Sequence, residues 1–212
     1  MTHFRTTRPA GPGKSDRGFS TIELATVVLV IGLISVMALP QALIAVKAYR
    51  LHSDTEALSS QLNMARFRAT SQNTPYRVQI DMAAAPHKFA LQRLCGGTLA
   101  SVDSSCSSAY QPRTGGAEFG PQMIELGNSF TTTNPGGTSV YPGTVTGGTA
   151  TSVFYFNTRG MPVDSSGNPL NNGGAVVYVT NGSNLTDAVV VSVGGRVSTY
   201  QWKPSSSTWS LR

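Results

Sequence analysis

The chain has 212 residues, which is room for one ordinary domain with accessory segments. Only 12% of its residues are charged and 22 are glycine, a composition that favours β-strands joined by turns over a helical bundle. The formal net charge of +6 suggests a nucleic-acid-binding protein until its distribution is considered. Four of the 16 basic residues and one of the 10 acidic residues lie within positions 1–18, so the remainder, with 12 basic and 9 acidic residues, has an ordinary solvated surface.

A long apolar run follows this basic leader. Residues 24–39 contain no charged side chain, and the apolar character extends from Phe19 to Val46. About 20 mostly apolar residues cross the hydrocarbon core of a membrane as a helix. Because basic residues precede the run, the positive-inside rule predicts a cytoplasmic N-terminus and an exported C-terminal part.

A cleaved secretory signal is the first alternative for this segment. Such a signal has an apolar region of about 7–15 residues, followed by a cleavage site with small residues. Here the apolar run is longer, and the small residue that stands out, Gly18, precedes it. The sequence therefore favours a retained membrane helix.

A single acidic residue, Glu23, lies at the start of the apolar run. A carboxylate inside a membrane is costly, and such residues usually have a function and a partner. Alternatively, Glu23 lies at the level of the lipid headgroups, where water keeps it ionised. Its position alone leaves both interpretations open.

The sequence around this acid resembles the class III signal of type IV pilins and type II secretion pseudopilins. Residues 14–24 read KSDRGFSTIEL. Members of that group share a basic leader, a glycine before the cleavage site, a phenylalanine after it and a glutamate at the fifth mature position. Gly18, Phe19 and Glu23 match these positions. Gly32 and Pro40 fall where many pilins carry helix-weakening residues.

The resemblance implies how the chain is processed and anchored. It implies that a prepilin peptidase cuts between Gly18 and Phe19 on the cytoplasmic side and methylates the new amine. The carboxylate of Glu23 would then neutralise the N-terminal amine of a neighbouring subunit, a pair that selects register more than it adds net stability. The segments implied are a cleaved leader (1–18), a transmembrane and filament-core helix (19–46), an amphipathic helix (47–73) and a periplasmic head (74–212).

Beyond Pro40 the apolar residues recur at intervals of three, four and seven, which is typical of a helix with one buried stripe. The helix should end near Asn73, because Pro75 disfavours helical geometry in the residue before it. We therefore expect one helix over residues 20–73, bent near Gly32 and Pro40. The expected buried stripe consists of Leu43, Val46, Ala48, Leu51, Leu58, Leu62, Ala65 and Phe67.

The remaining sequence predicts short strands separated by turns. Residues 76–82 and 88–94 alternate apolar and polar side chains and predict an early hairpin. The stretch 95–120 predicts a long irregular loop. Further strands are expected at 123–126, 152–156, 175–179, 188–193 and 196–202, the last two joined by a two-residue turn at Gly194–Gly195.

Two cysteines, Cys95 and Cys106, lie in a Gly/Ser-rich stretch without a Cys-x-x-Cys pair, so a zinc site is not expected. In an oxidising compartment, a disulfide between them would close a short loop and contribute about 2–3 kcal/mol. Two free thiols that never meet are the alternative.

The C-terminal half resembles the GspH/FimT group of minor pseudopilins and minor pilins. The resemblance rests on residues 154–162, FYFNTRGMP, followed by a polar loop, a β-rich run and residues 193–197, VGGRV. It implies an α+β fold in which a long N-terminal helix, half transmembrane and half amphipathic, packs on a small antiparallel β-sandwich head.

No catalytic constellation is apparent in the sequence. His3, His52 and His87 are too far apart to pair at helical or hairpin spacing. The glycines and serines form neither a phosphate loop nor a nucleophile elbow. We therefore expect neither an enzyme nor a bound metal or cofactor, and keep a membrane-anchored enzyme with a pilin-like leader as an alternative.

DNA binding is a separate question, since some FimT-type pilins bind DNA during natural transformation. Their C-terminal motif is Gly-Arg-x-Arg, whereas residues 195–198 read GRVS and lack the second arginine. Arg196, Lys203 and Arg212 are the remaining candidates, and three scattered cations predict weak, salt-sensitive binding at best. The nearby aromatic residues, which could stack on bases or cover a sandwich edge, are Tyr200, Trp202 and Trp209.

These features together predict a minor pseudopilin of a type II secretion system, a structural subunit that helps to export folded proteins. The alternative is a FimT-like minor pilin of a type IV pilus, which adds DNA uptake to pilus assembly. Both imply other pseudopilins or pilins, the prepilin peptidase, the inner-membrane assembly platform and, before assembly, membrane lipid as partners; DNA is not among the expected partners. Both place the chain in the bacterial inner membrane as a single-pass protein with a periplasmic head, and later in a filament.

Overall fold

The computed structural model describes residues 20–83, 85–94, 97–98, 101–102, 110–112, 122–124, 127–137, 140–143, 149–170, 173–182 and 185–212. Gly18 and Phe19 of the predicted cleavage site lie outside these residues, as do Cys95 and Cys106 of the predicted disulfide. The chain separates into two compact units, Met1–Ile44 and Ala45–Arg212.

One long helix, α1, extends over Thr21–Ser71 and contributes residues to both units. It begins where the carbonyl of Ser20 accepts a hydrogen bond from the amide of Leu24 (3.1 Å). It ends before Asn73, whose left-handed φ of 47° is a conformation that asparagine adopts at helix ends. The predicted helix over residues 20–73 is confirmed, with its C-terminal end two residues earlier.

The helix continues through Gly32 and Pro40. Proline has no amide hydrogen, so the carbonyl four residues before Pro40 loses its usual helical partner. A glycine inside a helix costs about 0.5–1 kcal/mol relative to alanine. Both residues therefore lower local helix stability without ending the helix, and the expected bend remains a prediction.

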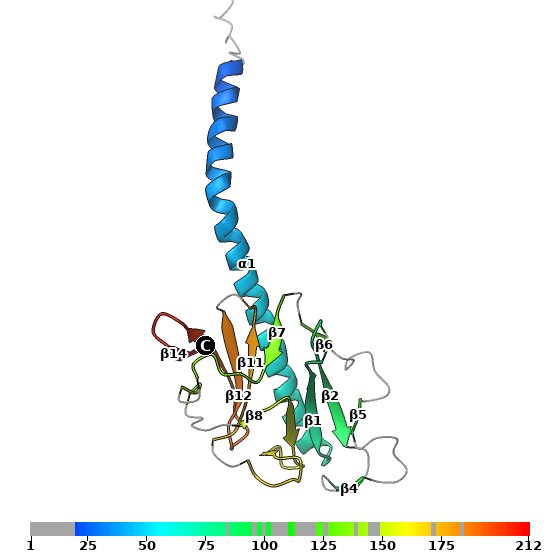
Figure 1. Cartoon of the computed structure of the whole chain (residues 1–212). Coiled ribbons are helices and arrows are strands. Elements are labelled where there is room, and N and C mark those ends of the chain that lie inside the picture. Colours follow the sequence, from blue (N-terminus) through cyan, green and yellow to red (C-terminus); the bar gives the residue numbers. More distant parts are fainter. Residues whose placement is uncertain are drawn as a thin grey trace, which may run out of the picture. The chain divides into compact units, whose positions relative to one another are not determined.

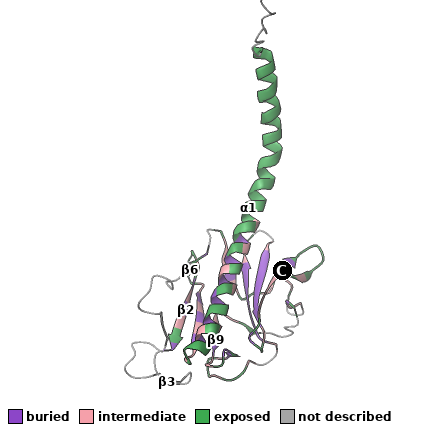
Figure 2. Ribbon diagram, turned by 180° about the vertical axis from the view of Figure 1, so that it is seen from behind, coloured by how far each residue is buried: buried purple, intermediate pink, exposed green. Residues whose placement is uncertain are grey.

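Within the unit Ala45–Arg212, one face of α1 is buried and the other is exposed (Figure 2). The prediction for Phe67 was wrong, because its side chain is 67% exposed. Phe67 follows the buried Leu58 by nine residues, which is two and a half helical turns, so it points the opposite way. Leu43 and Val46 are also exposed. The buried positions are Leu51, Asp54, Thr55, Leu58, Gln61, Leu62, Ala65 and Ala69.

Six strands form the first sheet of the head: β1 (Tyr76–Asp81), β2 (Lys88–Leu94), β5 (Tyr110–Pro112), β6 (Gln122–Met123), β9 (Val153–Phe156) and β10 (Pro162–Val163). Their order is β10-β9-β1-β2-β5, with β6 also paired to β2, and every pairing is antiparallel. The predicted early hairpin is confirmed as β1 and β2, with Tyr76 opposite Arg93.

The region 95–120 was predicted to be an irregular loop, but it contains three short strands among its described residues. Its strand β5 pairs with β2, because β2 offers backbone groups on the side away from β1. Two further strands, β3 (Gly97–Thr98) and β4 (Ser101–Val102), pair with each other. Strands of two or three residues leave too short an alternation of side chains to be recognised in the sequence.

Six strands form the second sheet: β7 (Ser129–Thr131), β8 (Thr149–Ala150), β11 (Ala175–Thr180), β12 (Thr186–Val191), β13 (Val197–Lys203) and β14 (Thr208–Leu211). Their order is β14-β13-β12-β11-β7, with β8 also paired to β11. The pairing of β8 with β11 is parallel, which departs from the wholly antiparallel head that was expected. Strand β14 was not predicted from the sequence.

The connection between β12 and β13 differs from the predicted two-residue turn. The amide of Gly195 donates to the carbonyl of Ser192 (2.8 Å), and the amide of Ser192 donates to the carbonyl of Arg196 (2.9 Å). These bonds leave a three-residue loop, residues 193–195. Such loops end on a residue in the left-handed region, which Gly195 supplies with a φ of 79°.

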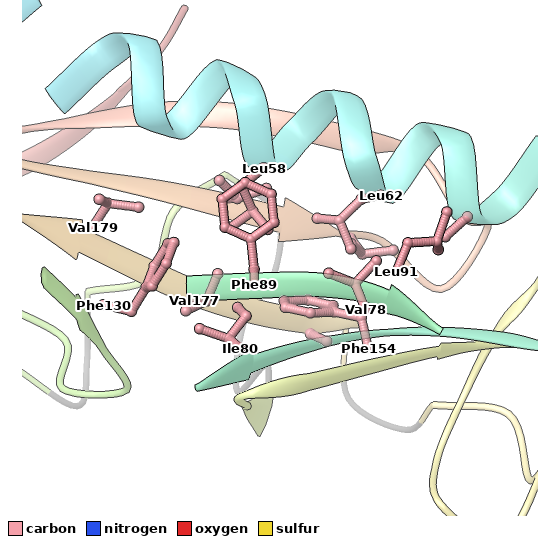
Figure 3. Close-up of a cluster of buried hydrophobic side chains, with 14 of the residues drawn as sticks. Leu58, Leu62, Val78, Ile80, Phe89, Leu91, Phe130, Phe154, Val177 and Val179 are labelled. Carbon is pink, nitrogen blue, oxygen red and sulfur yellow. The ribbon is translucent and has the colours of Figure 1, made fainter. Parts of the chain in front are cut away.

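The amphipathic part of α1 and both sheets share one hydrophobic core (Figure 3). Leu62 of α1 lies in this cluster with Val78 and Phe89 of the first sheet and Val177 of the second. Each is at least 98% buried, and burying an apolar side chain of this size contributes about 1.5–3 kcal/mol. The predicted α+β fold, a long N-terminal helix followed by antiparallel sheets, is confirmed.

Candidate functional site

The N-terminal part of α1 exposes apolar side chains on all sides. An 18-residue window of this helix has a mean hydropathy of 2.5 and no buried residue, so the helix is long and apolar enough to cross a membrane. Burial of such a surface is strongly favourable, and surfaces of this kind mark membrane or protein contacts. The large apolar residues exposed here are Ile22, Leu24, Val27, Val28, Leu29, Val30, Ile31, Leu33, Ile34, Val36, Met37, Leu39, Leu43, Ile44 and Val46.

Glu23 is the single charged residue between Thr21 and Val46. It lies in the first turn of α1, where the helix dipole favours a negative charge by about 0.3–1 kcal/mol. Its side chain is exposed. Among the residues that the structure describes, its carboxylate has no ion-pair partner, and its backbone carbonyl accepts a bond from Oγ1 of Thr26 (2.8 Å).

Gly32 has no steric reason to be glycine among the described residues. A Cβ built at this position meets no heavy atom within 4 Å. The intrinsic cost of glycine in a helix is therefore not offset by a close contact inside this chain. The role of Gly32 and Pro40 as helix-weakening residues remains a prediction.

Two contacts between polar side chains, both missed by the sequence analysis, are among those that join α1 to the head. Nδ1 of His52 lies 2.6 Å from Oδ2 of Asp187 in β12, and Nδ2 of Asn128 donates to Oδ2 of Asp54 (2.5 Å). The Asp187 side chain is fully buried, and its Oδ1 has no partner in the described part of the chain. A lone acid in the apolar strand β12 was the available sequence signal, but His52 is 135 residues away.

The three cations considered for DNA binding do not form one site. Arg196 precedes β13 and Lys203 ends it, so seven residues of strand, about 23 Å, separate them. Arg212 lies nearer to Arg196, because its amide donates to the carbonyl of Thr199 (3.1 Å). Only Arg196 and Arg212 therefore belong to the same end of the sheet.

The loop that carries Arg196 instead lies beside distant parts of the sequence that also carry an arginine. Nη1 of Arg66 in α1 donates to the carbonyl of Gly195 (3.1 Å). A Cβ built on Gly195 would lie 3.0 Å from the carbonyl oxygen of Gly160, so the loops that carry Arg159 and Arg196 touch. Arg66 and the loops that carry Arg159 and Arg196 therefore lie at one end of the head, an arrangement that linear spacing could not reveal.

The aromatic residues near the C-terminus pack on one another. The rings of Trp202 and Trp209 are 5.2 Å apart, and Trp209 lies 5.6 Å from Tyr178. Nε1 of Trp209 donates to the carbonyl of Val140 (3.3 Å), which holds a loop over this face of the second sheet. Burial raises the pKa of Tyr178 to about 12. The aromatic residues therefore cover the second sheet. Of the two roles considered from the sequence, stacking on bases and covering a sandwich edge, this packing favours the second.

A cavity of about 420 Å³ lies beside β9 and β10 and is lined by Val153, Tyr155, Val163, Asp164 and Leu170 among others. The carboxylate among its described lining residues is engaged in a turn, because Oδ1 of Asp164 accepts bonds from the amides of Ser166 and Asn168 (both 2.8 Å). The hydrogen bond from the Asn168 amide is the largest of the causes that hold the pKa of Asp164 below its usual value. Among the described residues, no group of three or more His, Cys, Asp or Glu side chains could hold a metal ion.

Comparisons with known proteins include a likeness of fold to a solved structure. No family model and no curated protein sequence matches the chain. Among solved structures, the minor pseudopilin EpsH from the type 2 secretion system of Vibrio cholerae is 9% identical, with a TM-score of 0.45, and the match covers 71% of this chain and 95% of that one.

Proposed function

We propose that the chain is a structural subunit of a pilin-like filament, and specifically a minor pseudopilin of the GspH/FimT type in a type II secretion system. The observation that carries the proposal is the first part of α1, which is apolar and exposed all round and has one carboxylate, Glu23, in its first turn. No such surface remains in water. Lipid covers it before assembly, and the helices of neighbouring subunits cover it afterwards.

Glu23 has a specific partner in this proposal. Cleavage between Gly18 and Phe19 by a prepilin peptidase would create an amine four residues before this carboxylate. A buried ion lacking a partner costs several kcal/mol, so a carboxylate and an amine of adjacent subunits are stable in an apolar filament core only when they meet. The pair thus sets the axial register in which subunits add at the inner-membrane assembly platform.

The mature N-terminus gives the direct test. Mass spectrometry of the chain purified from its native membrane should find N-methylated Phe19 as the first residue. The proposal also places the head in the periplasm. A chain that still begins at Met1, or one trimmed beyond Val46 and released from the membrane, would overturn the proposal. Gly18→Ala should be fully retained as precursor, whereas the matched change Gly32→Ala should be cleaved normally.

The second candidate is a FimT-like minor pilin that contributes to DNA uptake, and the contact of Arg66 with the loop of Arg196, which touches the loop of Arg159, favours it. Each phosphate contact adds to affinity and to its salt dependence. An electrophoretic shift assay with the full chain in detergent and a short DNA duplex at low salt is the test. The double change Arg159→Ala and Arg196→Ala should abolish the shift, and Lys203→Ala should not. A wild-type chain that causes no shift at low salt removes this candidate.

A further inference from the structure

The strand β14 is the outer strand of the second sheet and lies beside the C-terminus (Figure 1). The ladder that joins it to β13 shows which of its backbone groups are used. Ser210 is opposite Gln201 in the register, and the amide of Arg212 donates to the carbonyl of Thr199. Alternate residues of an antiparallel strand bond to the same neighbour. The amides and carbonyls of Thr208, Ser210 and Arg212 therefore face β13, and those of Trp209 and Leu211 face outward.

The outward groups of Trp209 and Leu211 have no backbone partner among the described residues. Strand edges with free amides and carbonyls pair readily with other chains, and proteins usually protect them with proline, charge or a covering segment. The edge strand β10 begins with Pro162, and its next residue, Val163, bridges to Pro169. The edge strand β5 ends with Pro112. Residues 208–211 contain neither proline nor charge, so β14 is the unprotected edge of these three.

The surroundings of β14 indicate what would pair with it. Trp209 and Leu211 point to the same face, and 58% of the Leu211 side chain is exposed. A cation lies at each end of the strand, since Lys203 is opposite Thr208 and Arg212 follows Leu211. Both cations are exposed, and neither has an ion pair within the described residues. A complementary strand would carry apolar side chains at alternate positions and a carboxylate at each end.

We propose that β14 binds an extended, acidic-ended segment of another protein chain, which adds as one further strand to the second sheet. Backbone hydrogen bonds to Trp209 and Leu211 would give the affinity, and the apolar face and flanking cations would select the sequence. The surface belongs to the head and uses neither Glu23 nor the apolar half of α1. The proposed binding by β14 is therefore independent of whether the chain assembles through that helix.

The test uses the full chain in detergent and a fluorescent, capped peptide of seven residues. The peptide has valine at positions two, four and six, threonine at three and five, and glutamate at both ends. Fluorescence anisotropy should rise to saturation with protein concentration, and empty micelles should give no rise. The same peptide with proline at position four cannot form the ladder and should bind at least tenfold more weakly.

Leu211→Pro is the decisive variant. It deletes an outward amide, and a proline is tolerated on an edge strand when its missing amide faces away from the sheet. Peptide affinity should fall at least about tenfold, the effect of a lost hydrogen bond and a steric clash. The near-ultraviolet circular dichroism of the Trp202–Trp209 pair should remain, which shows that β14 is still folded. Changing Arg212→Glu should weaken binding several-fold and reduce its salt dependence.

Four results would overturn the proposal. The first three are no binding by the wild-type chain at millimolar peptide, equal binding of the proline peptide, and unchanged affinity of a folded Leu211→Pro variant. A fourth is a concentration-dependent dimer in sedimentation that Leu211→Pro abolishes, because it would assign the edge to a second copy of this chain.

Discussion

The two halves of α1 share one continuous backbone but have opposite patterns of exposure. In residues 21–44 every side chain is exposed, and all but Glu23 are uncharged. In residues 45–71 eight positions are buried at helical spacing, and the charged residues other than Asp54 occupy other positions. The second half is stabilised by packing inside this chain, whereas the first half has to find its packing elsewhere. Under the proposed function, the difference separates folding of the head from assembly of subunits, and single substitutions can test each half.

Glu23→Ala should have the largest effect, and on assembly alone. In the proposed filament, removal of the carboxylate would leave the amine of the adjacent subunit buried without a partner, at a cost of about 3–5 kcal/mol. Cleavage of the leader should be unaffected, while co-purification with filament partners should be lost. Glu56→Ala is the matched control, because Glu56 is an exposed acid on the second half of the same helix. Normal co-purification of the Glu23→Ala protein would contradict the prediction.

His52→Ala should have the next largest effect, and on the head alone. It removes the partner of Asp187, whose side chain is fully buried, and an uncompensated buried charge typically costs about 3–5 kcal/mol. Denaturant unfolding in detergent, followed by tryptophan emission, measures the loss. Lys88→Ala breaks the exposed pair of Lys88 and Asp81 (3.5 Å) and should cost less than about 1 kcal/mol. Equal losses in the two variants would show that the His52 contact is a surface pair.

The membrane-helix pattern and the stripe around Leu58 could be predicted because each repeats over many residues. Strands β11 to β13 were predicted for the same reason, since each has at least six residues, of which at least four are Val, Thr, Tyr or Trp. The contact of His52 with Asp187 could not, because no local rule links residues 135 positions apart. The length of the loop at Gly195 was predicted wrongly, because two adjacent glycines fit several types of hairpin. Only the hydrogen bonds between β12 and β13 distinguish these types.

A matched pair of leucine substitutions compares the halves directly. Leu62 is fully buried and Leu29 is 68% exposed, although both lie on α1. Leu62→Ala should lower the free energy of unfolding of the head by about 2–5 kcal/mol. Leu29→Ala should leave it unchanged, since Leu29 is not among the described residues that form the core of the head. An equal effect of the two in denaturant unfolding would mean that the apolar half is packed against the head.

Alkaline pH should produce the smallest effect and should again distinguish the halves. The pKa of Tyr178 is raised from its ordinary 10.0 to about 12, first by burial and then by the proximity of Tyr141. Below pH 10 the contribution of the neutral phenol is complete. As the pH rises from 10 toward 12, the unfolded chain loses this proton before the folded chain does, so stability falls by about 2–3 kcal/mol.

Tyr178→Phe isolates that contribution, because other tyrosines and the lysines titrate in the same range in both proteins. The variant should lose less stability than the wild type between pH 9 and 12, measured by denaturant unfolding. Residues 21–44 contain no group that titrates there, so their helical circular dichroism in micelles should persist after the head unfolds. Equal losses in wild type and variant would show that Tyr178 already reaches water, and loss of the helical signal with the head would show that the two halves fold as one unit.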